Sequence, residues 1–87
     1  MKVLVEETSE EGLESLLGKT IEVWCLNYIY SGKLTGVGEK SIILEDAKVV
    51  YETGELDGSK FKDAQSIPKK WFIQSSMIES YGETDKC

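Results

Sequence analysis

The sequence predicts a mainly β fold: a small, strongly bent, open barrel of five strands, with a short α-helix at its N-terminal end. Its 87 residues fit a single domain over residues 1–87. Short segments alternate between apolar and polar residues, as half-buried strands do. Glycines interrupt one of these segments, where a strand would bend or bulge. The hydrophobic content of 40% is that of a folded chain.

The first element is a predicted helix over residues 9–17. Ser9 can cap its N-terminus, and the two glutamates that follow suit the positive end of a helix dipole. Leu13, Leu16 and Leu17 would share one face of the helix. Gly18 supplies the signal that ends it.

Five later segments are predicted to be strands. In the first, Ile21, Val23 and Cys25 occupy alternate positions and would share one face. The second contains Gly32 and Gly36, which favour a sharp bend. Residues between the third and fourth strands show no such pattern and predict an irregular loop over 54–70. The predicted strands are 20–26, 28–37, 41–52, 71–75 and 77–81.

Composition limits the function. The net charge is −6, and every basic residue is a lysine. Lysine offers a phosphate only a point charge, whereas arginine binds with two donors and stacks on bases, so composition alone disfavours nucleic-acid binding. The chain has no histidine to act as a base, its serines lack an evident activating partner, and no phosphate-cradling glycine motif occurs. We therefore expect no enzymatic activity.

We also expect no cofactor and no metal. The two cysteines lie far apart in the sequence and have no histidine partners. The acidic loop residues Glu52, Glu55, Asp57 and Asp63 fit no known calcium-loop spacing. No apolar run approaches the roughly 20 residues of a membrane span, and the N-terminal segment turns acidic at once. We expect a cytoplasmic protein with no membrane partner.

The order of elements and several short motifs resemble the Sm-like (LSm) family over roughly residues 10–81. One motif lies at the helix-to-strand junction, another forms the glycine-containing second strand and the end of the third, and the last spans the final two strands. The matching residues are Leu17, Gly18, Lys19, Gly32, Leu34, Gly36, Leu44, Glu45, Asp46, Ala47, Phe72, Ile73, Met77 and Ile78.

The resemblance implies a homo-oligomeric ring that binds RNA. In such rings the fourth strand of one subunit pairs with the fifth strand of the next. Closed head-to-tail pairing would satisfy the two free edges of a small open barrel. The subunit interface would then include Trp71, Phe72, Ile73, Ile78 and Tyr81.

The usual RNA-binding pocket of the family is altered here. The family holds a base with an Asp, a stacking residue and an Asn in one loop, and with an Arg-Gly pair in another. In this chain Gly38 stands where the Asp belongs, Lys40 lies near the stacking position, and Ser41 lies near the Asn. Gln74 and Ser75 replace the Arg-Gly pair. The resemblance thus implies a divergent RNA site formed by Lys40, Ser41, Gln74 and Ser75.

Two functions follow as expectations. The first is a non-catalytic ring that binds RNA or another single-stranded nucleic acid at its pore face. The alternative is a protein-interaction or structural ring that has lost RNA binding, in which the same four residues are solvated turns. Trp24, Tyr28 and Tyr30 could stack on bases, but such a cluster more often fills a core or an interface.

Overall fold

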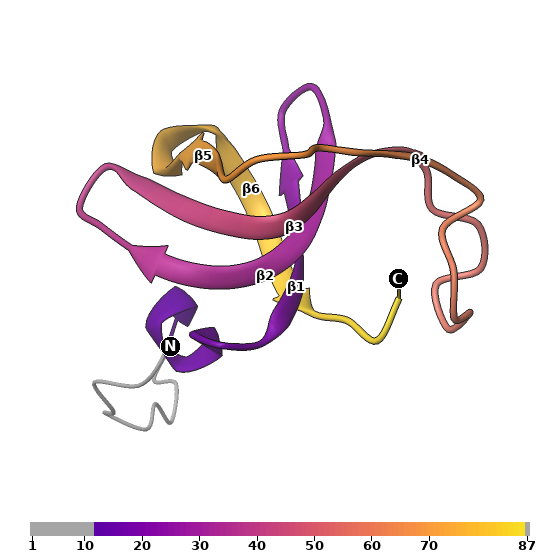
Figure 1. Ribbon diagram of the computed structural model, residues 1–87, viewed down its shortest axis with the longest axis horizontal. Coiled ribbons are helices and arrows are strands. Elements are labelled where there is room, and N and C mark those ends of the chain that lie inside the picture. The colour runs from indigo at the N-terminus through magenta and orange to yellow at the C-terminus, as the bar shows by residue number, and fades with distance from the viewer. Residues whose placement is uncertain (1–11, 87) are drawn as a thin grey trace, which may run out of the picture.

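The alternating segments form one antiparallel sheet of six strands in the computed structural model, which describes residues 12–86 (Figure 1). A 3-10 helix precedes the sheet and another joins its last two strands. No helix in the described part of the chain is long and apolar enough to cross a membrane. The elements are η1 Gly12–Leu16, β1 Thr20–Cys25, β2 Ile29–Val37, β3 Ser41–Glu52, β4 Asp63–Ser66, β5 Trp71–Gln74, η2 Ser75–Met77 and β6 Ile78–Glu83.

The long strand β3 organises the sheet. The strand order is β4-β3-β2-β1-β6, and β5 pairs with β3 outside this path. One side of β3 pairs with β2. On its other side, the N-terminal residues of β3 pair with β5 and the C-terminal residues pair with β4. Strands β4, β5 and β6 each pair along one side only within residues 12–86, so the sheet curls without closing into a barrel.

The sheet bends where the paired strands β2 and β3 approach each other closely. The register between them shifts after Ser31 and again after Leu34, which marks local bulges. Gly32 permits this close approach, because a Cβ atom there would lie 3.0 Å from both the Cα atom of Ala47 and the carbonyl oxygen of Glu45. Asp46, next to these contacts, adopts a positive φ of 51°.

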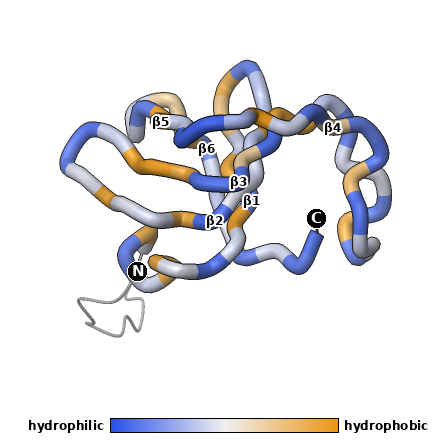
Figure 2. Tube along the Cα trace, in the orientation of Figure 1, coloured by the Kyte–Doolittle hydropathy of each residue, from blue (hydrophilic) through white to orange (hydrophobic). Residues whose placement is uncertain are grey.

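The bend encloses a small apolar core. Its central side chains come from β1, β2 and β3, and β5 adds one more. Figure 2 shows this as hydrophobic stretches along β2 and β3, with hydrophilic residues at the turns. The buried hydrophobic residues are Ile21, Val23, Leu34, Ile42, Leu44, Ala47, Val50 and Ile73.

The predicted α-helix is wrong within the described residues. Residues 9–11 lie outside them, and the chain from Gly12 to Leu16 forms a 3-10 helix. Gly12, the first residue of this 3-10 helix, has a φ of +80°, which lies outside the α-helical range, so the α-helix predicted over residues 9–17 does not run through it. Leu13 and Leu16 still pack against the core, because residues three apart also share a face in a 3-10 helix.

The prediction of five strands is also wrong, since the segment expected to be irregular contains β4. This strand is short and mostly exposed, and it is held by backbone pairing with β3. The last strand begins at Ile78, because Met77 belongs to η2, and it extends to Glu83. The mainly β class is confirmed, and the five-stranded barrel is replaced by an open sheet of six strands.

The close packing at the bend predicts that alanine substitutions at two strand glycines affect stability differently. Gly32→Ala should lower the free energy of unfolding by about 1–3 kcal/mol, the usual penalty for overpacking, because the new methyl group would meet backbone atoms. Gly82→Ala is the matched control, since no atom lies within 4 Å of a Cβ placed there. Urea unfolding at one fixed protein concentration measures both. Equal midpoints for the two variants would show that Gly32 does not enforce the bend.

Candidate nucleic-acid interface

The turn between β2 and β3 and the start of η2 form one shallow depression. Ser41 pairs with Gln74 at the first position of the β3–β5 ladder. The backbone N–H of Ser75 donates to the carbonyl of Lys40 at 2.8 Å, and the N–H of Gly38 donates to the carbonyl of Ser41 at 2.8 Å. These backbone contacts place Lys40, Ser41, Gln74 and Ser75 side by side.

The depression has a volume of about 560 Å³. Its lining contains all four residues of the predicted RNA site. It also contains Glu39 and Ser76, which the family resemblance does not include in that site. Glu39 directly precedes Lys40 in the same turn, so its presence could have been read from the sequence. Ser76 comes into the lining because η2 turns the chain directly after β5.

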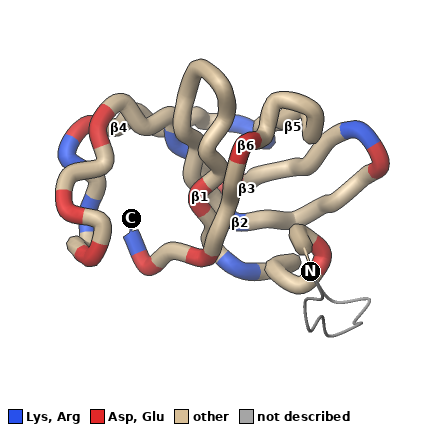
Figure 3. Tube along the Cα trace, turned by 180° about the vertical axis from the view of Figure 1, so that it is seen from behind, with Lys and Arg blue, Asp and Glu red and all other residues tan. Residues whose placement is uncertain are grey.

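The chemistry of this depression is that of weak polar recognition. Lys40 and Gln74 are exposed, and no ion pair within residues 12–86 involves Lys40. Its ammonium group can bind a phosphate, while the Gln74 amide and the serine hydroxyls can bond base edges. Glu39 offsets the charge of Lys40, as the adjacent blue and red segments at this turn show in Figure 3. One copy of the depression therefore carries no net positive charge.

The predicted interface residues divide into exposed and buried ones. Phe72 is 61% exposed, and Trp71 and Tyr81 are exposed to 43% and 40%. Ile78 is half-buried and packs against the core. Ile73 is a core residue of the single chain, with 5% of its surface exposed. The exposed three lie on β5 and β6, and each of these strands leaves one side without a strand partner in the described chain.

Aromatic side chains gather beside this edge. Tyr30 is half-buried against the core, and its ring centroid lies 6.3 Å from that of the more exposed Tyr28. Both line a hollow with Trp71 and Tyr51, of which the last was not predicted. Trp24 is half-buried, and its indole N–H donates to a carboxylate oxygen of Glu22 at 3.3 Å. The hollow offers a surface for an apolar or aromatic partner.

One of the acidic residues near the β3–β4 loop forms an ion pair. Glu52 pairs with Lys62 across 3.5 Å. Within residues 12–86, no three Cys, Asp or Glu side chains come together as metal ligands would.

No protein-family model matches this chain, and no curated protein has a sequence similar to it.

Cys25 lies at the end of β1, and its half-buried thiol lines a hollow with Tyr28 and Tyr30. Burial raises the pKa of this thiol above its ordinary value of 9.0, because the thiolate is poorly solvated there. Burial also raises the pKa of Tyr30, and the neighbouring Cys25 adds to that effect.

The thiol leads to a prediction about its reactivity. In a Cys87→Ser variant, alkylation of Cys25 by iodoacetamide should accelerate with rising pH. Its midpoint in the folded protein should lie above the midpoint in urea, because only the thiolate reacts. Rates of modification measured by mass spectrometry at a series of pH values test this. A folded-state midpoint at or below the unfolded one would contradict the described burial.

Proposed function

We propose that this chain is the subunit of an Sm-like, homo-oligomeric ring in the cytoplasm that binds single-stranded RNA without catalysis. The observation that carries the proposal is the depression at the β2–β3 turn. Four polar residues that stand in place of the family's RNA pocket come together there. Two of them, Lys40 and Ser41, are more than 30 positions from the other two, Gln74 and Ser75, in the sequence. Residues that bind one ligand must lie close together, and these four do.

The free sheet edges support the ring. Strands β5 and β6 each have one hydrogen-bonded neighbour among the described strands. An edge strand exposes backbone donors and acceptors that a strand of another chain can pair. If β5 of one subunit pairs with β6 of the next, the contact is head-to-tail, and it can close into a ring. Phe72 and Tyr81 would then be covered by the neighbouring subunit.

Repetition would supply the affinity that one depression lacks. A single lysine beside a glutamate gives little attraction for a phosphate. In a ring, one RNA strand would reach several copies of Lys40 and Gln74 in succession. Linked contacts of this kind raise the overall affinity well above that of any single contact.

The aromatic hollow favours the second candidate function, a ring that binds a protein. Tyr28, Tyr51 and Trp71 are all exposed in the described chain and line the same surface. Aromatic residues of this kind dominate the binding energy of protein interfaces. A protein partner held there would depend less on ionic strength than RNA held by lysines.

Lys40→Glu tests the RNA site. The change should weaken binding of oligo-U or oligo-A RNA at least tenfold, which corresponds to about 1.4 kcal/mol, because every subunit loses a phosphate contact and gains a repulsive charge. Fluorescence anisotropy at low and moderate salt, on protein of measured oligomeric mass, gives the affinities.

Lys60→Glu is the matched control, because Lys60 is exposed in the β3–β4 loop and outside the depression. It makes the same change in total charge and should leave the affinity nearly unchanged. An equal loss in both variants would mean that total charge governs binding. Absence of binding to wild-type rings at low salt would favour the protein-partner function instead.

Phe72→Asp tests the ring. A carboxylate placed on the free side of β5 should break subunit contacts, because a charge is costly to bury in an interface. Analytical ultracentrifugation should show a shift to smaller species. Leu56→Asp is the control, since Leu56 is also largely exposed but lies in the β3–β4 loop. A ring that survives Phe72→Asp would rule out assembly through this edge.

A further inference from the structure

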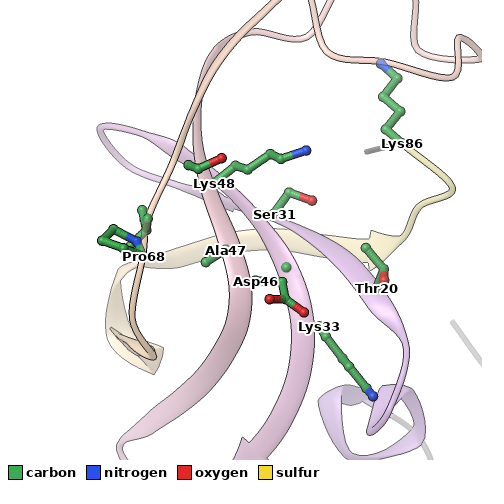
Figure 4. A pocket seen from close by; sticks show the side chains of 11 residues that line it. Thr20, Ser31, Lys33, Asp46, Ala47, Lys48, Pro68 and Lys86 are labelled. Carbon is green, nitrogen blue, oxygen red and sulfur yellow. The ribbon is translucent and has the colours of Figure 1, made fainter.

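A further hollow lies beside the middle of β3, at Asp46, Ala47 and Lys48, where β4 leads into the segment before β5 (Figure 4). It has a volume of about 450 Å³, within the roughly 300–1,000 Å³ of pockets that bind small molecules. Ile67, Pro68 and the backbone of Gly32 form part of its wall. Its polar residues come from β1, β2, β3, β4 and the C-terminal segment.

Three of these polar residues form a row across neighbouring strands. Ser31 of β2 is the register partner of Lys48 of β3, and Lys48 is in turn the partner of Ser66 of β4. Register partners in an antiparallel ladder present their side chains on the same face. The side chain of Lys48 therefore starts between those of the two serines, and Figure 4 shows Lys48 and Ser31 extending into the same space.

Ser31, one of this row, is almost completely buried. Only 3% of this residue is exposed, yet none of the side-chain hydrogen bonds within residues 12–86 includes it. Ser31 is part of the lining of the hollow. Its hydroxyl is therefore a candidate donor to a ligand bound there.

The lining of this hollow is net positive, whereas the whole chain is net negative. Lys33, Lys48 and Lys86 line the hollow with a single carboxylate, that of Asp46. Figure 4 places Asp46 beside Lys33 rather than beside the Lys48 ammonium group. The Lys86 ammonium donates to the carbonyl of Thr53 at 3.0 Å.

Lys48 keeps its charge free for a ligand. In the described chain, the ion pairs are those of Lys19 with Glu83 and of Lys62 with Glu52. The hollow thus concentrates positive charge in a protein whose net charge is −6.

We propose that this hollow binds a phosphate-sized oxyanion. The Lys48 ammonium group forms the ion pair, and the hydroxyls of Ser31 and Ser66 donate hydrogen bonds to the anion's remaining oxygens. The nearby charges of Lys33 and Lys86 favour entry of the anion. The site is separate from the depression at the β2–β3 turn, because Lys48 pairs with β4 whereas Ser41 pairs with β5.

The test is a titration with inorganic phosphate, which replaces chloride at constant ionic strength. Chemical shifts of the backbone amides report where the anion binds. In the wild-type protein, the amides of residues 31, 48 and 66 should shift in a saturable way. Lys48→Gln should weaken binding at least tenfold, the effect of losing about 1.4 kcal/mol from one charge-assisted hydrogen bond.

Ser31→Ala is the second variant, because it removes the Ser31 hydroxyl with little change in volume. It should weaken phosphate binding while the amide spectrum remains that of the folded chain. Lys60→Gln is the control, since it removes the same charge outside the hollow and should not alter binding. A parallel titration with uridine 5′-monophosphate distinguishes free phosphate from a nucleotide phosphate as the preferred source.

Saturable shifts confined to the hollow and lost in Lys48→Gln would support the site, whichever of the two anions binds more tightly. Shifts that are absent, that spread over all lysines, or that weaken equally in Lys48→Gln and Lys60→Gln would overturn it. RNA binding separates this outcome from the proposed function, because Lys48→Gln should leave the RNA affinity unchanged even where phosphate binding is lost.

Discussion

The close approach of the paired strands β2 and β3 at Gly32 is the constraint on which the remaining architecture depends. Because Gly32 has no side chain, the backbone of β2 approaches Ala47 and Glu45 closely, and β3 bends beside it at Asp46. On the side away from β2, a straight β3 would present one continuous edge to one partner strand. The bent β3 has two partner strands on that side: it pairs with β5 before the bend and with β4 after it. The depression at Lys40 lies at the end of β3 that pairs with β5, and the hollow at Lys48 lies where the pairing of β3 changes from β5 to β4.

The sequence predicts the strands well where one face is buried. Alternation reveals β1, because Ile21 and Val23 are fully buried and their neighbours are not. It fails for β4, whose residues are mostly exposed and whose stability comes from backbone pairing that leaves no pattern. The helix prediction fails for a different reason. Leucines at a spacing of three fit both helix types, and only the positive φ of Gly12 excludes the longer α-helix.

The two sites differ in how much of each the sequence could reveal. The residues around Lys40 and Gln74 were found because a family resemblance aligned two distant loops, and the β3–β5 register brings them together. No family resemblance or sequence pattern brings Ser31, Lys48 and Ser66 together. Ser31 falls on the polar face of its strand, which pattern reasoning assigns to solvent, and its partner across β3 belongs to the strand that was not predicted. Its burial follows from tertiary closure over the bend.

The charges of the depression at Lys40 and of the hollow at Lys48 suggest different kinds of ligand. At the β2–β3 turn, Lys40 is offset by Glu39, so a bound chain would be held by many weak and repeated contacts. In the proposed ring, RNA recognition there would depend on assembly, because one subunit offers too little attraction to hold an RNA strand. Beside the bend of β3, Lys48 has no ionic partner in the described chain, and its register partners are Ser31 and Ser66. A small anion could be held there by a single subunit. If both proposals hold, dissociation of the ring would abolish RNA binding and leave phosphate binding intact, which assigns the two activities to different levels of structure.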